Sequence, residues 1–153
     1  MDAATNSKLV KGAVLTGFIN AAINGGIQYF FLKGHDSIPI SVDSITNTTE
    51  TVLGTSVVLA ITLAMILTLV AYFGIKGEKA PFYPTAFWLT IKHGFFTFGV
   101  LTSLAVLWQK YMGTVEVPLV SALIIIGVIA GIVSGIVNYL TLKECTWIEK
   151  HKN

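Results

Sequence analysis

Four polar side chains recur at every fourth position in the first hydrophobic stretch of the chain. They are Thr16, Asn20, Asn24 and Gln28. Residues four apart lie on one face of a helix, so these four form a polar row about 18 Å long at 1.5 Å per residue. Amides are costly against lipid, and the row should therefore face protein or water. It could line a path for a small solute or ion, or it could form hydrogen bonds that hold helices together.

Two residues of a later stretch could add chemistry to this row. His93 is the one side chain in the hydrophobic stretches whose charge could change near neutral pH, and Thr97 lies one helical turn further on. We expect both to contribute to the lining at one end of a path, with a hydrogen-bonded packing role as the alternative for His93. The neighbouring Lys92 could extend its ammonium group to the headgroup region, or it could form an ion pair with Glu144.

Small residues also recur every four positions, in the first and the last hydrophobic stretch. Small side chains at this spacing let two helix backbones approach closely. We expect these residues to pack helices, either within one chain or between chains. They are Gly17, Ala21 and Gly25 in the first stretch, and Gly127, Gly131 and Gly135 in the last.

The composition indicates which elements must position these residues. Of the 153 residues, 54% are hydrophobic and 12% are charged, about half the charged fraction of a typical soluble domain. Each of four apolar stretches is long enough for a helix that crosses the bilayer. We therefore predict an all-α fold, an integral membrane four-helix bundle that forms a single domain. The predicted spans are residues 9–32, 51–75, 86–108 and 118–142, with an outer loop at 33–50 and a tail at 143–153.

The distribution of lysines predicts the orientation of the bundle. Cytoplasmic segments carry an excess of basic residues, so both termini are expected in the cytoplasm, in a plasma or inner membrane. Most lysines lie near the termini or between the second and third spans, and few lie in the other two loops. The first group is Lys8, Lys11, Lys76, Lys79, Lys143, Lys150 and Lys152, and the second is Lys33 and Lys110.

A few matched residues suggest a weak internal repeat, and a chance resemblance between hydrophobic helices explains them as well. Lys11 and Thr16 in the first span match Lys92 and Thr97 in the third, and the ends of the second and fourth spans match as well. The matched residues at those ends are Val70, Tyr72 and Lys76 with Val137, Tyr139 and Lys143. Two hairpins of one orientation would form a parallel repeat about an axis along the membrane normal.

Several kinds of site are missing from the sequence. A single cysteine, Cys145, excludes an internal disulfide and a CxxC motif, and the absence of arginine removes bidentate phosphate clamps. There is no carboxylate pair within a span, no HExxH metal motif and no glycine-rich phosphate loop. We expect no catalytic residues, no cofactor, no metal and no nucleic-acid partner.

The sequence therefore predicts a small oligomeric channel or transporter subunit, with the polar face of the first span along the path. The alternative is a non-catalytic accessory or assembly subunit of a larger membrane complex, in which the polar row is buried between helices. A membrane enzyme that acts on lipid is a third hypothesis. The expected partners are the lipid bilayer and either further copies of the chain or a larger membrane complex.

Overall fold

Four long helices account for most of the computed structural model, which describes residues 3–42 and 50–150, with side chains over 6–42 and 50–146. A short kinked segment, in which Tyr83 has extended backbone dihedrals, precedes α4, and two short strands lie in the loops. The helices are α1 (Ala3–Leu32), α3 (Val52–Gly74), α4 (Phe87–Met112) and α5 (Leu119–Lys150); the other elements are η1 (Phe82–Ala86), β1 (Ser37–Ile40) and β2 (Val115–Pro118). The predicted tail at 143–153 is helical as far as Lys150.

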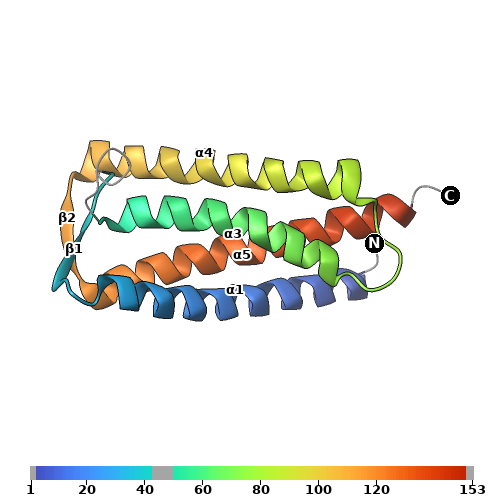
Figure 1. Ribbon diagram of the computed structural model, residues 1–153, viewed down its shortest axis with the longest axis horizontal. Helices are drawn as coiled ribbons and strands as arrows, with labels where there is room; N and C mark the ends of the chain where they lie inside the picture. Colours follow the sequence, from blue (N-terminus) through green and yellow to red (C-terminus); the bar gives the residue numbers. More distant parts are fainter. Residues whose placement is uncertain (1–2, 43–49, 151–153) are drawn as a thin grey trace.

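The helices α3 and α5 form the centre of the molecule, and α1 and α4 flank them (Figure 1). α1 packs along α5, α5 packs on α3, and α3 packs on α4, whereas α4 meets α5 at few positions. The N-terminal end of α1 and the C-terminal end of α5 lie at one end of the molecule, which we call the terminus end. The paired strands β1 and β2 lie at the opposite end, which we call the strand end.

The order of elements repeats as helix, strand, helix: α1–β1–α3 is followed by α4–β2–α5. The two strands pair antiparallel, with Ser37 opposite Pro118 and Ile40 opposite Val115. The first helix of each half packs on the second helix of the other half, because α1 contacts α5 and α4 contacts α3. The two halves therefore share one order of elements, and each packs mainly on the other.

The matched residues fit this arrangement in part. The shift that aligns Lys11 with Lys92 also aligns Gln28 with Gln109 near the strand ends of α1 and α4. The matched tyrosines Tyr72 and Tyr139 both lie near the terminus end. The ammonium group of the matched Lys143 lies 5.7 Å from the Tyr139 ring, but the lysine at the Tyr72 ring, at 4.5 Å, is Lys79 and not the matched Lys76. The order helix, strand, helix recurs in both halves, and an internal repeat in the sequence stays a prediction.

Three helical segments are long and apolar enough to cross a membrane: Val52–Gly74, Phe82–Met112 and Leu119–Thr146. Among the described residues, α1 is not one of them, so length and hydropathy support three of the four predicted spans. The three amides of the polar row lower the mean hydropathy of α1, although the outward face of this helix is apolar. On that face Phe18 and Phe31 are 72% and 73% exposed.

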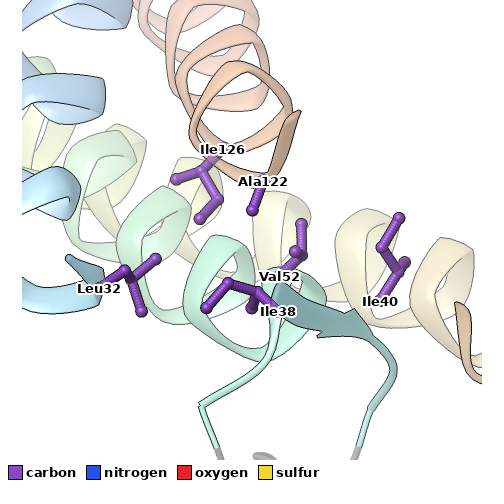
Figure 2. Packing of buried hydrophobic residues seen from close by; sticks show 6 residues of the cluster. All are labelled: Leu32, Ile38, Ile40, Val52, Ala122 and Ile126. Atoms are coloured by element: carbon purple, nitrogen blue, oxygen red, sulfur yellow. The ribbon is translucent and has the colours of Figure 1, made fainter. Parts of the chain in front are cut away.

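A buried apolar cluster holds the strand end together (Figure 2). Its side chains come from the end of α1, from β1, and from the first turns of α3 and α5. The members are Leu32, Ile38, Ile40, Val52, Ala122 and Ile126. Next to the cluster Thr51 caps α3: its hydroxyl accepts from the Gly54 amide at 3.1 Å and donates to the Ser41 carbonyl at 2.9 Å. Such a cap stabilises a helix by about 1 kcal/mol.

A second contact fixes the loop between α3 and η1 at the terminus end. The Ala80 amide donates to the Cys145 carbonyl of α5 at 3.0 Å. The Tyr72 hydroxyl of α3 donates to the Ala80 carbonyl at 2.9 Å. These bonds place the loop against both central helices.

Candidate functional site in the helix contacts

The small residues predicted to pack helices face one another between α1 and α5. A Cβ atom built on Gly17 would lie 2.8 Å from the Gly131 carbonyl oxygen, and one on Gly131 would lie 2.9 Å from the Gly17 carbonyl oxygen. Cβ atoms on Gly127 and Gly135 would each lie 3.1 Å from a carbonyl oxygen of α1. Real Cβ atoms essentially never approach a heavy atom closer than 3.0 Å. Only glycine therefore fits at Gly17 and Gly131 without a backbone shift.

The two remaining predicted packing residues lie in the same contact. A Cβ on Gly131 would lie 3.0 Å from the Cβ of Ala21, and one on Gly25 would lie 3.8 Å from the Leu123 carbonyl oxygen. The contact is thus closest around Gly17 and looser towards Gly25. All six small residues are used within one chain.

The polar row of α1 borders this contact. Asn24 is 6% exposed, and Thr16, Asn20 and Gln28 are partly buried. The Asn20 side-chain amide donates to the Thr16 carbonyl at 2.9 Å, and the Asn24 side-chain amide donates to the Asn20 carbonyl at 2.8 Å. These bonds within the helix reduce the cost of burying the two amides.

His93 lies in the other matched contact, between α3 and α4, and is 7% exposed. Its Nδ1 atom is 2.8 Å from the Thr68 hydroxyl oxygen, and that hydroxyl donates to the Ala64 carbonyl at 2.6 Å. A threonine hydroxyl has one proton to donate. It follows that Nδ1 of His93 carries a proton and donates it to Thr68, which joins α4 to α3. Thr97 is buried one turn further along α4.

The structure does not bring the six predicted lining residues together. Thr16, Asn20, Asn24 and Gln28 lie on α1, which packs on α5. His93 and Thr97 lie on α4, which packs on α3, and α1 and α4 flank the central pair on different sides (Figure 1). The residues form two separate polar groups, one on α1 and one on α4, and only Thr16 and Thr97 correspond in the aligned halves.

The predicted ion pair is absent. Within the part of the chain that the structure describes, Lys92 and Glu144 do not approach within salt-bridge distance, and both side chains are exposed. The reason is that α4 packs mainly on α3 and meets α5 at few positions.

Polar atoms without a hydrogen-bond partner gather near the strand end of the α3–α4 pair, and sequence reasoning missed them. Over the described residues they are the Ser56 and Thr102 hydroxyls, Trp108 Nε1 and Gln109 Oε1. Ser56 lies in the first turns of α3 and the others lie in the last turns of α4. No regular spacing marked these residues. Their atoms could bond to water molecules that enter from this end.

An apolar groove of about 560 Å³ follows the outer side of the α1–α5 contact. Gly17 and Gly131 line it where the two helix backbones meet, and Phe18, Ile132 and Ile136 line it on its exposed sides. These last three side chains are exposed. We call this feature the α1–α5 groove.

No known protein provides an independent guide to function. Compared with models of protein families, with curated proteins and with solved structures, the chain matches none. Over the described residues there is also no group of three or more His, Cys, Asp or Glu side chains that could hold a metal ion. The function must therefore be argued from the helix contacts, the groove and the outer surface.

Proposed function

We propose that the protein is an integral membrane protein that acts as a non-catalytic accessory or assembly subunit of a membrane complex. One observation carries the proposal: three of the polar side chains predicted to line a path, Asn20, Asn24 and His93, hydrogen-bond within the chain. Asn20 and Asn24 donate to carbonyls of their own helix, and His93 donates to Thr68 of the neighbouring helix. The two asparagine bonds satisfy the amides within α1, and the His93 bond joins α4 to α3. The apolar exterior is then the surface that meets partners.

The exterior supports insertion in a bilayer. Large hydrophobic side chains are exposed on all four long helices, for example Phe18 on α1, Val58 on α3, Phe95 on α4 and Ile132 on α5. Soluble monomers rarely expose continuous apolar patches of more than a few hundred Å². In lipid the same side chains are well solvated.

We further propose that α1 crosses the membrane together with the three apolar helices. Its 30 residues correspond to about 45 Å, more than the roughly 30 Å of the hydrocarbon core. It runs along α5 with backbones in close contact, and its polar row borders that contact. Four crossings place both termini on one side, which the lysine distribution assigns to the cytoplasm.

A specific observation favours a second candidate, the channel or transporter subunit. Thr16, Asn20 and Gln28 remain partly exposed beside the α1–α5 contact. Parallel repeats about an axis along the membrane normal also occur in transporters. In this candidate, α1 would separate from α5, or a second copy of the chain would complete the path.

Thiol accessibility distinguishes the two candidates. In a Cys145→Ala background, single variants Asn20→Cys and Asn24→Cys are treated in intact vesicles with a water-soluble, membrane-impermeant thiol reagent. For a packing role we expect no labelling of either variant. Asp36→Cys, in the exposed loop after α1, is the control and should be labelled when its side of the membrane is accessible.

Labelling of Asn20→Cys and Asn24→Cys at a rate close to that of Asp36→Cys would contradict the packing role. That outcome would favour the channel, because it requires water along most of the polar row. The reagent is applied to vesicles of both orientations, so that lack of access from one side is not read as burial.

A further inference from the structure

The α1–α5 groove ends in positive charge at the terminus end. Tyr139 lines the groove, and its hydroxyl donates to the Asn6 side-chain oxygen of α1 at 3.0 Å. The ammonium group of Lys143 lies 5.7 Å from the centre of the Tyr139 ring. On the other helix Lys11 precedes the groove residue Val14 by three positions and so lies beside the groove on the same side of α1.

Among the described residues, the charged side chains beside the terminus end of the groove, which we call its mouth, are mainly positive. Lys11 and Lys143 are exposed beside it, and Glu144 is the one acidic side chain described next to either of them in sequence. The mouth also offers neutral hydrogen-bonding groups in Asn6 and Tyr139. These features complement a phosphate group.

The length of the groove matches one leaflet of a bilayer. Its lining extends from Val10 to Ala21 on α1 and from Val128 to Leu140 on α5. At 1.5 Å per residue these segments measure about 17 and 18 Å, slightly more than half of the roughly 30 Å hydrocarbon core. A transmembrane helix of a partner would run the full depth, whereas a lipid chain of one leaflet would end where the groove ends.

We propose that the α1–α5 groove binds an acyl chain of an anionic phospholipid whose phosphate lies between Lys11 and Lys143. The exposed apolar side chains of the groove contact the acyl chain, and the two lysines attract the headgroup. The proposal rests on membrane insertion, which is tested separately through the location of the termini. If both termini are found in the cytoplasm but anionic lipid is not retained preferentially, only the lipid proposal is overturned.

Native mass spectrometry of the full chain in detergent tests the headgroup. The protein is mixed with phosphatidylglycerol or with phosphatidylcholine of identical acyl chains, and retained lipid adducts are measured. We expect phosphatidylglycerol to be retained preferentially, and Lys11→Gln and Lys143→Gln each to weaken its retention about fivefold. The control Lys110→Gln removes a lysine at the strand end of α4 and should leave retention unchanged. Equal retention of the two lipids, or no effect of the lysine variants, would overturn the proposal.

A second pair of variants tests the groove itself. Val14→Trp places a large ring in the groove and should abolish retention of both lipids, whereas Val58→Trp on the exposed face of α3 should not. Ile132→Trp repeats the test from the α5 side if Val14→Trp does not fold. Unchanged adducts in a folded groove variant would contradict the site.

Two other occupants give distinct results. Displacement of phosphatidylglycerol by inorganic phosphate at equal concentration would show a phosphate site without a lipid chain, and would overturn the proposal. A dimer signal that disappears in Val14→Trp would assign the groove to a second copy of the chain, with the same consequence.

Discussion

Two glycines set how closely α1 and α5 approach each other. Gly17 and Gly131 each face a backbone carbonyl of the other helix at a distance that a Cβ atom would violate. The neighbouring helix backbone cannot move aside as the end of a flexible side chain could. The stability of the α1–α5 pair should therefore depend strongly on these two positions.

We expect Gly131→Leu to lower the free energy of unfolding by about 1–3 kcal/mol or more, because overpacking usually costs that much. Gly26→Leu is the matched control, because a Cβ atom at Gly26 meets no heavy atom within 4 Å. Denaturation in mixed micelles, followed by circular dichroism, measures both variants. Equal stability of the two variants would mean that α1 does not pack on α5 as described.

The bond between His93 and Thr68 links α4 to α3 at a buried position. Thr68→Val removes the acceptor and leaves Nδ1 of His93 without its partner. Hydrogen bonds between membrane helices contribute about 0.6 kcal/mol on average, and up to about 1.7 kcal/mol. We expect a loss in that range, and rescue by Thr68→Ser, which keeps the hydroxyl.

Thr90→Val is the matched control for the His93 bond. Thr90 is also buried on α4, but its hydroxyl donates to the Ala86 carbonyl of the same segment of chain at 2.8 Å. Its removal leaves no donor on another helix unpaired. If Thr90→Val lowers the free energy of unfolding as much as Thr68→Val does, the effect comes from the change of volume and polarity and not from the bond between the helices.

At the scale of elements, the sequence predicted helices better than it predicted their partners. Long apolar runs are sufficient to locate α3, α4 and α5, and the four-residue spacing marks the faces of α1 and α5 that meet. A periodic pattern gives the face of a helix but not the helix that it contacts. His93 therefore could not be assigned to Thr68, which is 25 residues away in an apolar run. The strands were missed because β1 and β2 have four residues each and pair across 75 or more residues of chain.

The element whose position matters most for topology is α1. If it crosses the membrane, the chain crosses four times and the termini lie on the same side. If α1 stays outside the bilayer, three crossings leave the termini on opposite sides. Reporters fused to the N-terminus and to the C-terminus, one active in the cytoplasm and one active outside it, measure the two locations.

We expect both fusions to report the cytoplasm. A reporter inserted after Gly34, in the exposed turn that follows α1, is the control and should report the outer side. Opposite locations for the two termini would contradict four crossings, and would also remove the reason for placing the polar row inside the bilayer.

At the scale of the whole molecule, the two halves interlock. The main helix contacts, α1 with α5, α3 with α4 and α3 with α5, all join one half to the other, and so does the pairing of β1 with β2. Contacts between the two helices of a single half are few. The matched residues of the repeat indicated two similar hairpins, but they carried no information on whether each hairpin closes on itself or on the other.

Division of the chain after Gly77, in the exposed loop between α3 and η1, tests the interlocking. We expect residues 1–77 and 78–153 to be unstable when expressed separately, because each half then exposes the faces that the other covers. Expressed together, they should co-purify through a tag on either half. Gly131→Leu in the second half should reduce the recovered complex, and Gly99→Leu, where a Cβ atom meets nothing within 4 Å, should not. A second half that accumulates alone as a stable monomer would show that α4 and α5 need no partner from the first half, which the observed contacts do not allow.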